Sequence, residues 1–274
     1  MAANTVRTAV DRDRAAARRG WLVRVAVGVG GGGMLVGALV GCGSAEAEEA
    51  PVERKAFALE GERLTVDSDH SAVEVVAADV EKVEVSRQID GWVFVGSGPE
   101  ASWRMDGERL VLRMSCKAIA SDCAGRQTVK VPRGVAVTVV DENGGVTASG
   151  FSTPLKINSG NGDVTVRDTS GALDLTSDNG TITTERVTAK TVRAVSDNGE
   201  VRIGLKAGAV PERVETVSDN GGIRIDLPRA GAPYAVTAKS DNGTVDVDPA
   251  VGSGGTRVVS ARSDNGWVKV RAAD

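Results

Sequence analysis

The string Ser-Asp-Asn-Gly occurs five times in the second half of the chain, starting at residues 177, 196, 218, 240 and 263. Two variants precede it, Asp-Glu-Asn-Gly and Ser-Gly-Asn-Gly, so that seven segments share one Asn-Gly pair. The seven asparagines, spaced 18 to 23 residues apart, are Asn143, Asn161, Asn179, Asn198, Asn220, Asn242 and Asn265. Repetition at this period predicts a solenoid, in which each coil covers the apolar face of its neighbour.

The residues that flank each Asn-Gly pair alternate between apolar and polar. Aliphatic residues stand six positions before and three positions after all seven asparagines, while the positions between them are mostly polar or charged. A period of two indicates a strand on each side of the turn, with one dry face. We therefore predict an all-β protein, a parallel β-helix (β-solenoid) with roughly 18–23 residues and two strands per coil. Asn-Gly between alternating strands is also a hairpin signal, so a series of hairpins is the alternative.

A degenerate copy of the repeat lies earlier, in "LTVDSDHSAVEV", where His70 takes the place of the asparagine. His70 is the only histidine of the chain, and this position favours a turn residue over a catalytic one. We expect residues 57–135 to form irregular coils that cap the open end of the stack. Residues 136–274 should form the regular coils of the same continuous solenoid, because terminal repeats are usually atypical.

The first 41 residues have the composition of an export signal. They contain six arginines and two aspartates, followed by an apolar stretch that ends in Leu39, Val40, Gly41 and Cys42. This ending resembles the signal of bacterial lipoproteins and implies lipidation of Cys42. An uncleaved transmembrane anchor is the alternative, although five near-consecutive glycines make a poor helix.

The segment "RRGWL" upstream resembles a twin-arginine export motif, and the general secretory route stays open beside it. Both routes lead to an extracytoplasmic protein, held at the cytoplasmic membrane of a bacterium through its N-terminal lipid. Residues 42–56 are charged and rich in alanine, without alternation, and are expected to form a flexible tether.

Cys116 and Cys123 stand close together in "CKAIASDC". In an oxidising compartment this pair predicts a disulfide. A metal site would need more cysteines or histidines than this region offers.

The repeated turns allow a structural and a functional interpretation. Asn-Gly closes a tight turn without strain, and stacked asparagines can hydrogen-bond to one another. Carboxylates at one offset should also line up about 4.8 Å apart, where calcium would relieve their repulsion. No other cofactor is expected. The same residues form the structural turns in both interpretations, and in the second the aspartates also bind calcium. They are Asp178, Asn179, Asp197, Asn198, Asp219, Asn220, Asp241, Asn242, Asp264 and Asn265.

From about residue 57 to 274 the sequence resembles the bacterial DUF4097 group of candidate adhesins. The likeness rests on the early Ser-Asp turn, on "DGERLVLR" at Asp106–Arg113 and on the serial Asn-Gly turns followed by alternating valines. The resemblance implies an envelope-facing β-helix, often anchored by lipid, with no catalytic residues to carry over.

Three functional hypotheses follow. The first is a non-catalytic, adhesin-like scaffold that binds an envelope polymer or a surface protein. The second is a regulatory lipoprotein that docks on a membrane signalling protein during envelope stress. The third is a polysaccharide-acting enzyme, which the scattered acids and the absence of a catalytic triad disfavour. A formal net charge of −4 without a basic stripe argues against nucleic acid as a partner.

Overall fold

The computed structural model describes residues 50–93, 96–118, 121–229, 233–252 and 254–273. The predicted export signal, the lipidation site Cys42 and most of the predicted tether lie outside these residues. Within the described part of the chain, no helix is both long and apolar enough to cross a membrane.

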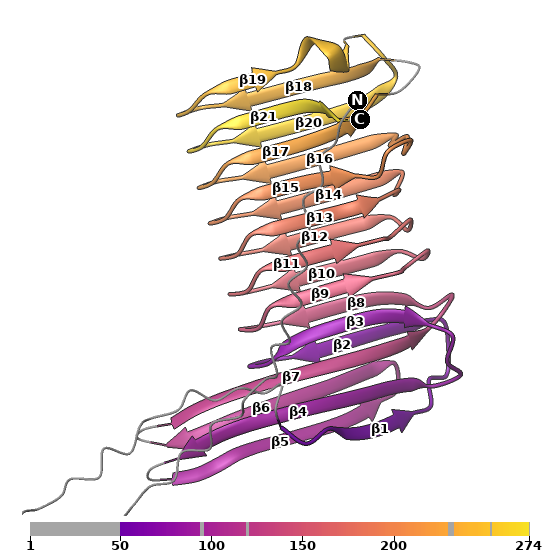
Figure 1. Ribbon diagram of the computed structural model, residues 1–274, viewed down its shortest axis with the longest axis vertical. Coiled ribbons are helices and arrows are strands. Elements are labelled where there is room, and N and C mark those ends of the chain that lie inside the picture. The colour runs from indigo at the N-terminus through magenta and orange to yellow at the C-terminus, as the bar shows by residue number, and fades with distance from the viewer. Residues whose placement is uncertain (1–49, 94–95, 119–120, 230–232, 253, 274) are drawn as a thin grey trace, which may run out of the picture. The chain divides into compact units, whose positions relative to one another are not determined.

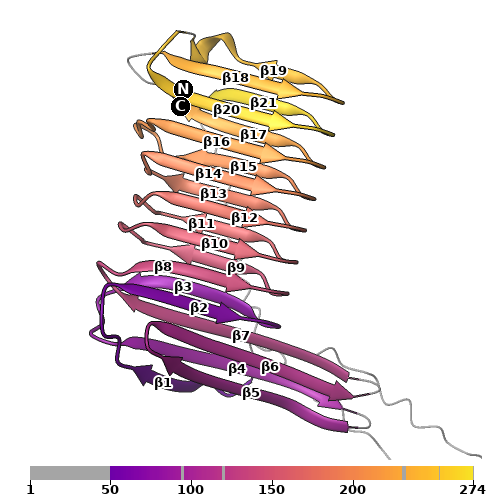
Figure 2. The same ribbon diagram turned by 180° about the vertical axis from the view of Figure 1, so that it is seen from behind.

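The described residues belong to one compact unit, Gly43–Asp274, in which strands from two sheets stack in a regular ladder (Figures 1 and 2). Sheet A has eleven strands. In chain order they are β1 (Glu53–Phe57), β3 (Ala72–Ala78), β4 (Val83–Val93), β7 (Ser121–Pro132), β9 (Val146–Ser149), β11 (Val164–Arg167), β13 (Ile182–Val187), β15 (Val201–Leu205), β17 (Ile223–Pro228), β19 (Val245–Val247) and β21 (Val268–Ala273).

Sheet B has ten strands and faces sheet A across the core. They are β2 (Arg63–Ser68), β5 (Gly96–Asp106), β6 (Arg109–Ala118), β8 (Ala136–Asp141), β10 (Leu155–Ser159), β12 (Leu173–Ser177), β14 (Thr191–Ser196), β16 (Arg213–Ser218), β18 (Tyr234–Ser240) and β20 (Arg257–Ser263). One short 3-10 helix, η2 (Pro249–Val251), follows β19.

Each regular coil consists of a sheet B strand, an Asn-Gly turn and a sheet A strand. Strands of neighbouring coils pair in parallel and in the register of the repeat, as in Leu155 with Leu173 and Val164 with Ile182. The two strands that flank one turn belong to different sheets, so the turn closes no hairpin. The predicted parallel β-solenoid with two strands per coil is thereby confirmed.

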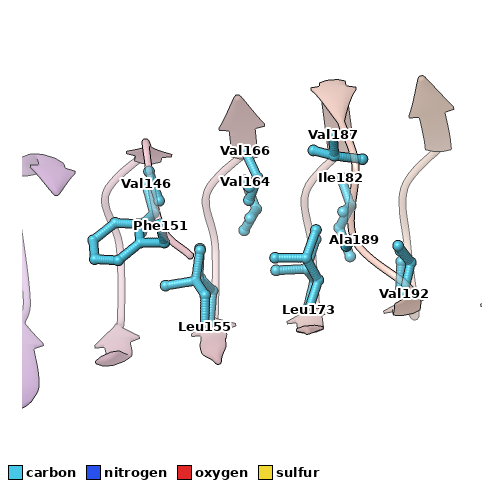
Figure 3. Close-up of a cluster of buried hydrophobic side chains, with 14 of the residues drawn as sticks. Val146, Phe151, Leu155, Val164, Val166, Leu173, Ile182, Val187, Ala189 and Val192 are labelled. Atoms are coloured by element: carbon cyan, nitrogen blue, oxygen red, sulfur yellow. The ribbon is translucent and has the colours of Figure 1, made fainter. Parts of the chain in front are cut away.

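The core lies between the two sheets and is made of the aliphatic columns that the sequence shows. Figure 3 shows these side chains converging from both sheets, with Leu155 and Leu173 from sheet B facing Val164 and Ile182 from sheet A. All four are at most 2% exposed. Burial of a Val or Leu side chain contributes about 1.5–3 kcal/mol, so the repeated columns supply most of the stabilisation.

The last two coils do not stack in chain order. Sheet A ends in the order β17, β21, β19, and sheet B ends in the order β16, β20, β18. The C-terminal coil is therefore inserted between the two coils that precede it in sequence. Gly222 allows this insertion, because a Cβ there would lie 2.3 Å from the indole of Trp267 on the inserted coil.

The N-terminal end shows a second insertion, since the β2–β3 coil lies between the β6–β7 coil and the β8–β9 coil. Beyond it the pairing becomes antiparallel, between β5 and β6, between β4 and β7, and between β1 and β4. Residues 57–135 thus combine two parallel coils with antiparallel strands. Residues 53–56, which the sequence assigns to the tether, instead belong to β1, which pairs with β4 and buries Phe57.

The predicted disulfide is present. Cys116 in β6 and Cys123 in β7 are joined with an S–S distance of 2.00 Å. The bond links the two sheets near the ends of their long strands.

Candidate binding surface

The serine and the glycine of each Ser-Asp-Asn-Gly turn are fixed by contacts between neighbouring coils. The serine is buried in four of the five turns, and Ser240 of the terminal coil is half-buried. The serine hydroxyl donates to the glycine carbonyl of the adjacent turn, at 2.9 Å from Ser196 to Gly180 and from Ser218 to Gly199. A Cβ at Gly199 would lie 2.1 Å from that same Gly180 oxygen. No side chain fits so close to a backbone atom, so stacking alone explains these two residues.

The asparagine side chains form one continuous ladder along the exposed edge of the turns. In six of the seven residues the side-chain amide nitrogen donates to the amide oxygen of the preceding asparagine in the ladder, over 2.9–3.1 Å. The order of the ladder follows the coils in space: Asn143, Asn161, Asn179, Asn198, Asn220, Asn265 and Asn242. These hydrogen bonds satisfy the side-chain amides of the asparagines, which would otherwise compete for the backbone hydrogen bonds of the turns.

The aspartates of the turns form a parallel column, and their amides donate to the buried serine's carbonyl in the adjacent coil. Arg262 bridges Asp241 and Asp264 with nitrogen–oxygen distances of 2.7 and 2.8 Å. Within the described residues, no group of three or more His, Cys, Asp or Glu side chains is placed to hold a metal ion. Calcium binding stays a prediction for the remaining members of the column, Asp178, Asp197 and Asp219.

Asp141 departs from the repeat, because it occupies the buried serine position of its turn. The residue is 2% exposed, its Oδ2 accepts from the Gly144 amide, and its Oδ1 has no partner in the described structure. Burial raises the pKa of Asp141 to about 6; hydrogen bonds from Gly144 and Ser68 offset part of this effect, and the charges of Asp69 and Glu142 add to it.

A shallow groove of about 730 Å³ runs across the outer face of sheet B, over β2, β8, β10, β12 and β14. Its floor is formed by three small residues in neighbouring positions at, or directly before, the start of successive strands: Ala136, Pro154 and Ala172. They point outward because the next residue in each strand faces the core. The groove crosses the strands and therefore follows the direction in which the coils stack.

Polar side chains line the groove beside this floor. Asp174 lies between Lys156 and Arg193, at 3.1 and 3.4 Å, in an ion-pair row that links three coils. Thr65 and Thr138 continue the same row on β2 and β8. The surface thus offers hydroxyl groups and charges of both signs along an apolar strip.

Next to the groove, Asp67 is held by two arginines from β6. Arg113 Nη2 and Arg109 Nε donate to its Oδ2 at 2.8 and 3.0 Å. Burial by itself would raise the pKa of Asp67, but the hydrogen bonds and charges of Arg113 and Arg109 outweigh it and lower the pKa below its usual value. This carboxylate is therefore committed to a structural ion pair.

The structure brings the turn residues named from the sequence into two adjacent columns, one of aspartates and one of asparagines, while Cys42 lies outside the described residues. His70 occupies the turn between β2 and β3, with an exposed side chain 3.8 Å from Asp69. Sequence reasoning missed the groove. The available signal was the small residue seven positions before each of the first three asparagines, which becomes meaningful only once neighbouring strands are in register.

Comparison with known proteins agrees with this architecture. A candidate adhesin of solved structure from Bacteroides fragilis NCTC 9343 aligns with 81% of this chain and 97% of its own, at 15% identity and a TM-score of 0.51. A second one, from Parabacteroides distasonis ATCC 8503, aligns with 81% of this chain and 98% of its own, at 9% identity and a TM-score of 0.46. No curated protein matches the sequence significantly.

At such identities the Bacteroides structure shows a shared fold and nothing more. The family assignment comes from the sequence, since the model of the Toastrack DUF4097 family matches residues 114–271, more than half of the chain. The chain therefore belongs to the Toastrack DUF4097 family.

Proposed function

We propose that this protein is a non-catalytic, lipid-anchored scaffold of the bacterial cell envelope, which binds an extended glycan along the groove of sheet B. The observation that carries the proposal is the direction of the groove. It crosses five consecutive strands, so a linear polymer lying in it would meet similar groups from coil to coil. Weak contacts that repeat along one ligand add up through effective concentration.

The chemistry of the groove supports a hydroxyl-rich ligand. Ala136, Pro154 and Ala172 leave a low apolar strip on which the carbon face of a sugar ring can lie. The threonines and the ion-pair row beside it supply donors and acceptors for hydroxyl groups. Arg63 lies at one end of the strip without an ion-pair partner among the described residues, and it favours a polymer that carries acidic groups.

The carboxylates that line the groove argue for binding without catalysis. Glycosidases use a pair of carboxyl groups, one of which must hold and release a proton. Here Asp174 is neutralised by two cations, and Glu108 is the other carboxylate in the lining. A binding role for this protein is compatible with the description of similarly folded proteins as candidate adhesins, and with the predicted lipid anchor at Cys42.

A matched pair of variants tests the proposal. Ala172 and Ala235 occupy the same outward row of sheet B, but Ala235 lies on the terminal strand β18, outside the groove. Ala172→Trp fills the groove and should weaken binding of the full-length protein to purified, acid-bearing cell-wall polysaccharide by about tenfold or more, through steric exclusion. Ala235→Trp should leave binding unchanged. Equal affinities of both variants would refute the groove as the binding site.

In-cell crosslinking of the lipidated protein tests the broader assignment, with Cys42→Ala as the control that should lose the membrane. Recovery of wall glycan without a dominant protein partner is the expected result. A single membrane protein recovered in stoichiometric amount would overturn the scaffold assignment and favour a regulatory lipoprotein.

A further inference from the structure

The asparagine ladder has a chemical consequence beyond stacking, because every asparagine in it precedes a glycine. In an Asn-Gly pair the glycine amide nitrogen is unshielded by a Cβ and can attack the asparagine side-chain carbon. A nitrogen–carbon bond forms, the side-chain amide leaves as ammonia, and a cyclic succinimide results. Water then opens the ring on either side to give aspartate or isoaspartate, so the reaction needs no co-reactant except water.

We propose that the Asn-Gly column is a self-modification site, which deamidates first at the two ends of the ladder, Asn143 and Asn242, while the ladder protects its interior. The attack requires the side chain to leave its position and turn toward the glycine nitrogen. In the interior both amide hydrogens are bound. Asn198 Nδ2 donates to Asn179 Oδ1 at 3.0 Å and to the Asp178 carbonyl at 3.3 Å, while its Oδ1 accepts from Asn220 at 3.0 Å.

The two end residues lack part of this restraint. Asn143 accepts from Asn161, but within the described structure its own amide nitrogen donates to no acceptor. Asn242 donates to Asn265 at 3.1 Å, and its oxygen accepts from no described residue. Asn242 also belongs to the outermost coil, where Val245 is 44% exposed. Local opening is easiest where contacts are fewest.

The direction of the hydrogen bonds makes the two ends unequal. An aspartate carboxylate at position 143 still accepts from Asn161, so deamidation to aspartate there preserves the ladder. A carboxylate at position 242 cannot donate to Asn265, and Asn265 then becomes the new end. The reaction therefore advances inward from the Asn242 end only.

Site-resolved peptide mapping by mass spectrometry tests this order. Full-length protein in detergent is aged at mildly alkaline pH beside a sample unfolded in urea. In the unfolded sample the seven asparagines should react at similar rates. In the folded sample Asn179 and Asn198 should react about tenfold more slowly than Asn143 and Asn242. Interior rates equal to the end rates would overturn the proposal.

The variant Asn242→Ala gives an independent check, because it makes Asn265 the end of the ladder without changing the Asn265–Gly266 pair. The rate at Asn265 should rise several-fold, while the rate at Asn179 stays unchanged and shows that the coils remain folded. An unchanged rate at Asn265 would show that the ladder does not protect its members. A rise at Asn179 as well would assign the protection to global stability and would equally contradict the proposal.

Discussion

Replacing Asp141 by serine should remove a pH-dependent destabilisation that is specific to the first Asn-Gly turn. Asp141 takes the position that serine holds in the six other Asn-Gly turns, and burial raises its pKa to about 6. A carboxyl group in an unfolded chain titrates near 3.9. Between about pH 4 and pH 6 the folded state therefore holds a proton that the unfolded state has lost.

This difference in bound protons sets the sign of the pH dependence of stability. Where the folded state binds the extra proton, the free energy of unfolding falls as pH rises, and the loss is complete above about pH 6. A pKa difference of about two units corresponds to about 3 kcal/mol. Asp141→Ser should thus be more stable than the wild type by up to about 3 kcal/mol at pH 7.5, and the gain should disappear toward pH 4.

Urea denaturation followed by circular dichroism, on full-length protein in detergent at a series of pH values, measures this effect. Subtracting the wild-type free energy from that of the variant cancels the titration of all other groups. Ser177→Asp serves as the mirror control, because it places a carboxyl group in an equivalent fully buried position. It should lose stability as pH rises. A variant-minus-wild-type difference that does not change between pH 4 and pH 7 would refute the reasoning.

Three further changes test the stacking of the coils. Gly199→Ala places a Cβ 2.1 Å from the Gly180 carbonyl and should cost about 3 kcal/mol in urea denaturation. Gly145→Ala should be tolerated, because a Cβ there would lie 3.8 Å from the Asp163 carbonyl oxygen. Asn198→Ala removes two ladder hydrogen bonds and one to the Asp178 carbonyl and should cost about 1–2 kcal/mol. Asn242→Ala, which removes one ladder hydrogen bond, should cost less, and equal costs would contradict the ladder. Reduction of Cys116–Cys123, seven residues apart, should lower the free energy of unfolding by about 2 kcal/mol, and an unchanged midpoint of thermal unfolding would contradict this estimate.

The sequence by itself determined the strands, their inward faces and the period of the repeat, because this information is local, while the alternative of serial hairpins was excluded only by the observed pairing. Alternation on both sides of each Asn-Gly pair assigns the inward columns, and a one-residue slip would move every aliphatic side chain to the solvent. The parallel register of Leu155 with Leu173 follows directly from equal distances to the following asparagine. The Cys116–Cys123 disulfide was also readable, since the two residues are close in the chain.

Only the tertiary structure decided the order of the last coils. Three identical Ser-Asp-Asn-Gly turns fit one another equally well, so the local pattern does not distinguish β16–β18–β20 from the observed β16–β20–β18. Contacts between distant residues settle it, among them the indole of Trp267 over Gly222. The groove of sheet B and the burial of Asp141 arise in the same way, because each depends on which strands become neighbours in space.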